Sequence, residues 1–149
     1  MAASDARHHV RPSRPDDVGD VLAIEERCFQ QPNAALLMRL CGVTDTLLVC
    51  ERAGAVAGYV LAAPTSATAG RVISLAVAPA YRERGVGSAL MAETLDLLAG
   101  KGIDEVELET RVSNDAAMAL YEKFGFTVVG RKPGYYDDGE DAYLMRTWL

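Results

Sequence analysis

Apolar and polar positions along this chain follow two periodicities, one typical of strands and one typical of helices. The strand pattern is clearest where Val106, Leu108 and Thr110 alternate with glutamates, because a period of two places alternate side chains on opposite faces of a sheet. The helical pattern is clearest after Val86, where large apolar residues recur three and four positions apart. Together these patterns predict the order β-α-α-β-β-β-α-β-α-β-β. The expected strands are 9–11, 46–51, 56–62, 72–77, 105–110, 127–130 and 142–147, and the expected helices are 15–29, 34–40, 86–98 and 114–124.

The segment 72–77 is apolar at nearly every position, which is typical of a strand buried on both faces. Because a strand, a helix and a second strand in succession form a right-handed crossover, we expect 72–77 and 105–110 to be parallel. The hairpins before and after this unit are expected to be antiparallel. The sequence therefore predicts an α/β fold with a mixed, mostly antiparallel sheet, one central parallel pair and four helices, in a single domain spanning 1–149. A loop of small residues is expected at 64–70.

Composition and charge narrow the possible functions. The formal net charge of −6 and the pI of about 4.9, without a basic stripe, argue against nucleic-acid binding. No apolar run reaches the roughly 18 residues of a membrane span, and the polar N-terminus resembles no secretory signal, so we expect a cytoplasmic protein that does not enter a membrane. The three cysteines lack C-x-x-C spacing and are expected to be reduced, and His8 and His9 lack partners at metal-binding spacing, so no metal is expected.

The segment Arg82–Ser88 carries the clearest chemical signal, since it joins an apolar strand to a predicted helix and contains two arginines and two glycines. The N–H groups of a helix's first turn and its dipole favour an anion, and glycine lets a phosphate approach the backbone. The segment therefore predicts a diphosphate site. The sequence argues against a dinucleotide fingerprint, because Leu90 stands at the third glycine position and the segment 79–82 makes the turn too long, and a lone glycine pair is also found at ordinary helix starts.

Three segments in order resemble RimI-type protein N-terminal acetyltransferases of the GNAT (Gcn5-related N-acetyltransferase) superfamily. They are 73–88, which contains an R-x-x-G-x-G loop, 108–117 and 120–126. The resemblance implies the GNAT fold, acetyl-CoA as cosubstrate, and a protein or peptide N-terminus as acceptor, with a ribosomal protein among the candidates.

The resemblance also implies a role for individual residues. The coenzyme would be bound by Leu75, Ala76 and Val77 along its pantetheine arm, by Arg82, Arg84, Gly85, Val86, Gly87 and Ser88 at its diphosphate, and by Asn114. Glu109 would accept the proton of the attacking amine, and Tyr121 would donate a proton or a hydrogen bond to the leaving sulfur. Phe29, Tyr135 and Tyr136 would contact the acceptor.

Each of these residues also has an ordinary structural interpretation. Glu109 alternates like a residue on a solvated strand face, Tyr121 has the spacing of a core residue, and Asn114 is a typical helix cap. The tyrosine pair could stand at a solvated hairpin tip. Many relatives carry an aromatic-proline turn between the first two helices; the segment 28–33 retains Phe29 and Pro32 but spaces them apart and lacks a following Trp, which weakens the inference that this chain shares their substrate. Two other functions therefore stay open, a GNAT enzyme for a small amine or a lysine side chain, and an acyl-CoA-binding sensor without turnover.

Overall fold

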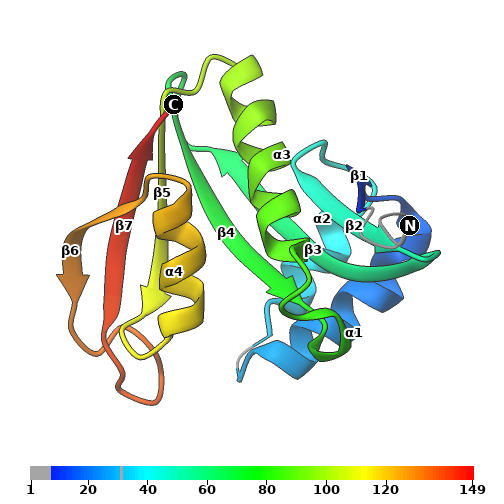
Figure 1. Cartoon of the computed structure of the whole chain (residues 1–149), viewed down its shortest axis with the longest axis horizontal. Coiled ribbons are helices and arrows are strands. Elements are labelled where there is room, and N and C mark those ends of the chain that lie inside the picture. The colour runs from blue at the N-terminus through cyan, green and yellow to red at the C-terminus, as the bar shows by residue number, and fades with distance from the viewer. Residues whose placement is uncertain (1–7, 31) are drawn as a thin grey trace. The chain divides into compact units, whose positions relative to one another are not determined.

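A computed structural model describes residues 8–30 and 32–149 of the chain (Figure 1). All seven predicted strands and four predicted helices are present in this described part. The strands are β1 His9–Pro12, β2 Leu47–Arg52, β3 Ala55–Pro64, β4 Ala69–Val77, β5 Glu105–Arg111, β6 Thr127–Lys132 and β7 Ala142–Trp148. The helices are α1 Val18–Cys28, α2 Ala34–Leu40, α3 Val86–Gly100 and α4 Asp115–Lys123. Residues 1–7, part of the polar N-terminal segment, lie outside the described residues.

The strands are hydrogen-bonded in the order β1-β2-β3-β4-β5-β7-β6. β4 and β5 are parallel, as the crossover predicts, and the pairs β1–β2, β2–β3, β5–β7 and β6–β7 are antiparallel. The prediction of a mixed, mostly antiparallel sheet with one parallel pair is therefore confirmed. The expected loop at 64–70 is shorter than predicted, because β3 extends to Pro64 and β4 already begins at Ala69.

Two short segments differ from the predicted helices. The residues Pro15–Asp17 form a 3₁₀ turn, and α1 begins only at Val18. The Asp17 carboxylate accepts the Arg14 N–H at 2.6 Å and is also bound by the Arg11 guanidinium, so it closes the turn before the helix. Phe29 does not continue the apolar face of α1, because its extended backbone makes it the C-cap of that helix.

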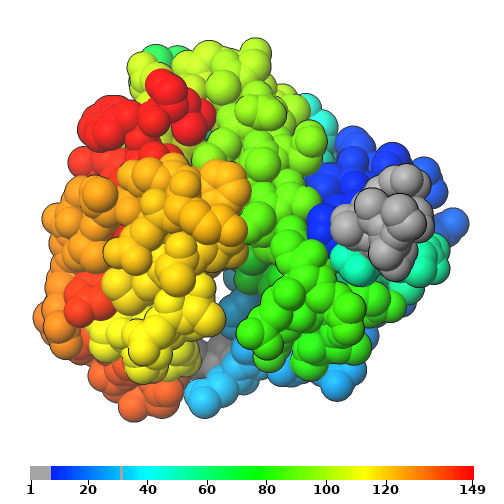
Figure 2. Space-filling view, viewed as in Figure 1, coloured from blue at the N-terminus to red at the C-terminus, as the bar shows by residue number. Residues whose placement is uncertain are grey.

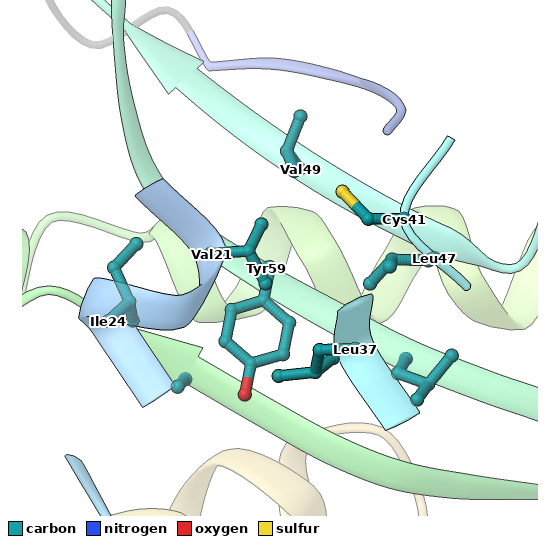
Figure 3. Packing of buried hydrophobic residues seen from close by; sticks show 9 residues of the cluster. Val21, Ile24, Leu37, Cys41, Leu47, Val49 and Tyr59 are labelled. Carbon is teal, nitrogen blue, oxygen red and sulfur yellow. The ribbon is translucent and has the colours of Figure 1, made fainter. Parts of the chain in front are cut away.

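The chain divides into two compact units, of which unit 1 comprises residues up to 62 and 74–94 and unit 2 comprises 63–73 and 95–149. In unit 1, α1 and α2 pack on β2 and β3 around one apolar cluster (Figure 3). The cluster consists of Val21, Ile24, Leu37, Cys41, Leu47, Val49, Tyr59, Leu61 and Ala76. Tyr59 has the largest fully buried side chain among the described residues, and its ring lies between Ile24 and Leu37.

In unit 2, β5 and β7 form the longest ladder, with seven paired residues from Glu105 opposite Trp148 to Arg111 opposite Ala142. The alternating pattern of β5 has the predicted consequence, because Val106, Leu108 and Thr110 are buried on one face. No helix among the described residues is long and apolar enough to cross a membrane. No group of three or more His, Cys, Asp or Glu side chains in this described part is placed so that it could hold a metal ion.

Candidate active site

The residues expected to bind the coenzyme on unit 1 lie at the end of β4 and in the turn that follows it. The backbone carbonyl of Val77 accepts a hydrogen bond from Arg82 Nε at 3.1 Å and one from the Cys28 thiol at 3.6 Å. A second guanidinium nitrogen of Arg82 lies 3.3 Å from Cys28 Sγ. Arg82 thus folds back on the strand end, so it helps to shape this segment besides adding positive charge.

The turn before α3 has the backbone that a diphosphate site requires. Glu83 and Gly85 both adopt left-handed φ angles, of 62° and 85°, and α3 begins at Val86. A helix's first-turn N–H groups have no partner within the helix, so they are directed to the side from which a phosphate would approach. The side chains of Arg82 and Arg84 are exposed beside them, and Figure 2 shows this turn at the surface in green. The residues present therefore fit the diphosphate of a coenzyme.

The acceptor residue expected on unit 1, Phe29, lies where α1 ends. Its N–H donates the last helical hydrogen bond to Glu25 O at 3.0 Å, and its side chain is 38% exposed, which leaves the ring accessible.

On unit 2, the candidate base Glu109 lies on the half-buried face of β5 and is not solvated. Arg71 from β4 and Lys132 from β6 both form ion pairs with its carboxylate, Lys132 Nζ at 2.5 Å from Glu109 Oε2. The Glu109 side chain is only 6% exposed. The neighbouring glutamates of this face are paired as well, since Arg146 from β7 binds both Glu105 and Glu107. The simple expectation of a solvated strand face is therefore wrong, because every glutamate of β5 has a cationic partner.

Tyr121 lies in the second half of α4 and is 8% exposed. Its ring packs edge-on against Phe126, with the ring centroids 5.9 Å apart. Burial raises the pKa of the Tyr121 phenol to about 12, and the neighbouring phenol of Tyr136 adds to this rise. The hydroxyl is consequently protonated at neutral pH and can act as a hydrogen-bond donor.

Asn114 is the N-cap of α4, since its Oδ1 accepts the Ala117 N–H at 3.1 Å. The structural interpretation of Asn114 is confirmed. A contact with the coenzyme would use the remaining amide NH₂ group, which is a donor.

The predicted tyrosine pair lies in the loop between β6 and β7, and this loop is tied to the rest of unit 2. Tyr135 and Tyr136 pack edge to face with centroids 5.0 Å apart, and the Arg111 guanidinium lies 4.0 Å from the Tyr136 ring centroid. Arg111 also forms ion pairs with Asp138 and Glu140. Asp138, Glu140 and Asp141 of this region therefore bind cations and backbone N–H groups of unit 2.

These contacts bring most of the expected site residues of unit 2 into one cluster. Lys132 links Glu109 to the Tyr135 ring, whose centroid is 5.2 Å from Lys132 Nζ, and Tyr135 in turn packs against Tyr136. Reasoning from the sequence missed Arg71, Lys132 and Arg111, which hold this cluster together. A signal was present for Arg111 alone, because it lies within the matching segment 108–117.

Of the three cysteines, Cys28 is the one that contacts expected site residues, namely Val77 and Arg82 of unit 1. All three are free, and burial raises the pKa of Cys41 and raises that of Cys50 to about 11. A thiol with such a high pKa is a poor nucleophile at neutral pH.

Known proteins resemble this chain over nearly its whole length. The profile of the acetyltransferase (GNAT) family matches residues 14–126. An N-alpha-acetyltransferase of Sulfurisphaera tokodaii is 34% identical over 152 residues, which cover 93% of this chain and 91% of that protein. The crystal structure of Ard1 from Thermoplasma volcanium has a TM-score of 0.89 and 32% identity, over 95% of this chain and 97% of that one. The ribosomal-protein-S18-alanine N-acetyltransferase of Escherichia coli has a TM-score of 0.85 and 27% identity, over 96% and 94%.

Proposed function

This chain belongs to the GNAT acetyltransferase family and is an acetyltransferase, and we propose that it transfers the acetyl group of acetyl-CoA to the α-amine at the N-terminus of a protein or peptide. The names of its relatives support this acceptor, since the archaeal relative is an N-alpha-acetyltransferase and the E. coli structure is an enzyme for a ribosomal protein. A ribosomal protein is accordingly one acceptor to test, and the cytoplasm is the expected location.

The observation that carries the proposal is the tied tyrosine loop of unit 2. Tyr135 remains 45% exposed although its loop is fixed, so an aromatic surface is held ready beside Lys132 and Glu109. An exposed aromatic ring offers contact area to a peptide, and a rigid surface loses little entropy when a flexible peptide binds.

The chemistry follows from the groups present. A terminal α-amine has a pKa of about 7.7–8.0, so it is mostly protonated at neutral pH and must lose a proton before it can attack. Glu109 takes that proton through a water molecule, the amine nitrogen bonds to the thioester carbon, and the carbon–sulfur bond breaks. The Tyr121 hydroxyl donates a hydrogen bond to the sulfur as negative charge develops there. After the attack the nitrogen loses a second proton and the departing thiolate takes up one, so the products are the N-acetylated terminus, the free thiol and one proton released to solvent.

The residues proposed to hold acetyl-CoA fit its charge. The turn Arg82–Ser88 offers two exposed guanidinium groups and a helix start to the diphosphate, and Leu75–Val77 offers a strand backbone to the pantetheine amides.

An acceptor panel tests the proposed function directly. Release of thiol from acetyl-CoA is measured with a free peptide, with the same peptide blocked at its N-terminus but carrying a lysine, and with a polyamine and an aminoglycoside. We expect turnover of the free peptide only. If only the blocked peptide or only a small amine is acetylated, the acceptor is a lysine side chain or a small amine. If acetyl-CoA binds without any turnover, the protein is an acyl-CoA-binding sensor.

The role of Glu109 is tested by an isosteric pair. Glu109→Gln should lower kcat by about 10²- to 10⁴-fold, the range for loss of a general base. Glu107→Gln is the matched control, because Glu107 lies on the same face of β5 and also binds a cation, Arg146. An equal loss in both variants would mean that Glu109 acts only through the ion pairs of this face.

A further inference from the structure

Glu25 is a buried carboxylate of unit 1 that the proposed chemistry does not use. It lies in the last turn and a half of α1 and is 3% exposed. Three groups donate hydrogen bonds to it: the Asn33 N–H to Oε2 at 2.8 Å, Ser74 Oγ to Oε1 at 3.2 Å, and the hydroxyl of Tyr59 to Oε1. The hydroxyls of Tyr59 and Ser74 are themselves 2.9 Å apart. One side chain therefore joins α1, β3, β4 and the start of α2.

None of these three donors is charged. A buried carboxylate without a cation among its donors costs free energy, and burial accordingly raises the pKa of Glu25. An apolar side chain of similar size would fill the same space without this cost. Unlike an apolar side chain, the carboxylate forms directional hydrogen bonds that connect the four elements.

The tied elements carry residues proposed for both substrates. Glu25 holds the segment after α1 at two points, since its backbone carbonyl accepts the Phe29 N–H at 3.0 Å and its carboxylate accepts the Asn33 N–H. Ser74 is the residue immediately before Leu75–Val77, the proposed pantetheine strand. The Cys28 thiol contacts Val77 O at the far end of that strand. The end of α1 is thus fixed to both ends of Leu75–Val77.

We propose that Glu25 is a positioning residue that fixes Phe29 and Asn33 against the coenzyme-binding end of β4. This inference rests on the proposed function, because Phe29 and Leu75–Val77 matter only if they contact acceptor and coenzyme. A reacting pair misplaced by about 1 Å can lose 10²-fold in rate, so such a tie affects turnover more than coenzyme binding.

Four variants separate positioning from stability. Glu25→Leu removes every hydrogen bond of the carboxylate. Glu25→Gln retains them, because its carbonyl can accept from Asn33 while its NH₂ donates to the hydroxyls of Tyr59 and Ser74. Ser74→Ala removes the link from Glu25 to β4 together with the contact between the Ser74 and Tyr59 hydroxyls. Ile24→Ala is the matched control, since Ile24 is the buried neighbour of Glu25 in α1 and makes only apolar contacts through its side chain.

We measure kcat/KM for the peptide that the parent acetylates best, the affinity for acetyl-CoA alone, and the melting temperature. Glu25→Leu should lower kcat/KM by about 10- to 100-fold, with coenzyme affinity within about threefold of the parent. Ser74→Ala should show a smaller loss of the same kind, and Glu25→Gln should recover most of the activity. Ile24→Ala should lower the melting temperature and leave kcat/KM near that of the parent.

The proposal would be overturned if Ile24→Ala, besides lowering the melting temperature, lowered kcat/KM as much as Glu25→Leu does. Full activity of Glu25→Leu would also overturn it. If Glu25→Leu does not fold, Ser74→Ala decides, and unchanged kcat/KM in that variant overturns the proposal. If the parent acetylates small amines and no peptide, the proposed acceptor is wrong, and the same variants compared on that amine decide the role of Glu25 separately.

Discussion

The hydroxyl of Tyr121 offers the sharpest test of the proposed chemistry. Tyr121→Phe keeps the ring that packs edge-on against Phe126 and removes only the oxygen. If Tyr121 is merely a core residue, the variant should keep both its activity and its stability.

The magnitude of the expected loss follows from the raised pKa of Tyr121. A phenol with a pKa of about 12 is a much weaker acid than a thiol with a pKa of about 8.5, and the difference of about 3.5 units corresponds to roughly 5 kcal/mol. Full transfer of the proton to the leaving thiolate is therefore uphill, and the phenol should act as a hydrogen-bond donor. Such a bond to a charged group contributes about 1.5–3 kcal/mol, so kcat should fall by about 10- to 150-fold.

The assay is thiol release at saturating peptide and acetyl-CoA, with a single-turnover measurement to establish that chemistry limits the rate. A second acyl donor whose thiol is more acidic forms a more stable thiolate, which needs less stabilisation by the Tyr121 hydroxyl. The loss of kcat in Tyr121→Phe should therefore be smaller with that donor. Because the pKa of Tyr121 is about 12, the phenol should remain protonated, and kcat should show no decline due to Tyr121 below about pH 11.

Three results would refute this reasoning. Full activity of Tyr121→Phe would leave packing as its only role. A loss above about 10³-fold, beyond what a hydrogen bond supplies, would mean that the proton is transferred. An equal loss with both donors would mean that the hydroxyl positions a substrate and does not stabilise the sulfur.

Three further predictions concern the residues that shape the two units. Gly58→Ala should destabilise the chain by about 1–3 kcal/mol in urea, because its Cβ would lie 2.8 Å from a backbone oxygen of β4, and a change below about 0.5 kcal/mol would contradict this. The hydrogen bond from Arg11 holds the pKa of Asp17 below its usual range, so this carboxylate contributes stability above its unfolded pKa of about 3.9 and loses it as pH falls through the lower folded value. Asp17→Asn should therefore flatten the fall in the urea midpoint below about pH 4, and an unchanged slope would argue against it. Arg111→Leu should raise KM for the peptide about tenfold while coenzyme affinity stays within about twofold, because the guanidinium that covers the Tyr136 ring and pairs with Asp138 and Glu140 is lost. An unchanged KM would mean that this loop does not contact the acceptor.

The sequence was sufficient for the order and pairing of the elements, because strongly periodic segments such as β5 and α3 carry their own signal. It was insufficient at the start of β4. Ala69 and Gly70 have low strand propensity, and they are in the strand because they pair with Glu105 and Val106 of β5 in the parallel ladder. A partner more than thirty residues away decides such a boundary, and no local pattern records it.

The same limitation explains the candidate site of unit 2. Alternation on β5 indicates which residues share a face, but it does not indicate what lies opposite that face. Lys132 is 23 residues from Glu109, and Arg146 is 39 residues from Glu107, so the pairing of β5 with β7, and of β7 with β6, brings each charge to its partner. The resemblance to a family identified Glu109, whereas its cationic partners Arg71 and Lys132 required the register of four strands, β4, β5, β7 and β6.

Glu25 and Glu109 show how environment assigns two buried carboxylates to different tasks. Glu25 accepts hydrogen bonds from neutral donors only, so a neutral amide can replace it and keep the elements of unit 1 together. Glu109 is bound by two cations and, in the proposed mechanism, must accept a proton, which an amide does not do. The same isosteric change should therefore have opposite effects, with Glu25→Gln largely active and Glu109→Gln nearly inactive. The two variants can be compared on one peptide. An inactive Glu25→Gln would show that the charge of Glu25 is essential, and an active Glu109→Gln would show that another group is the base.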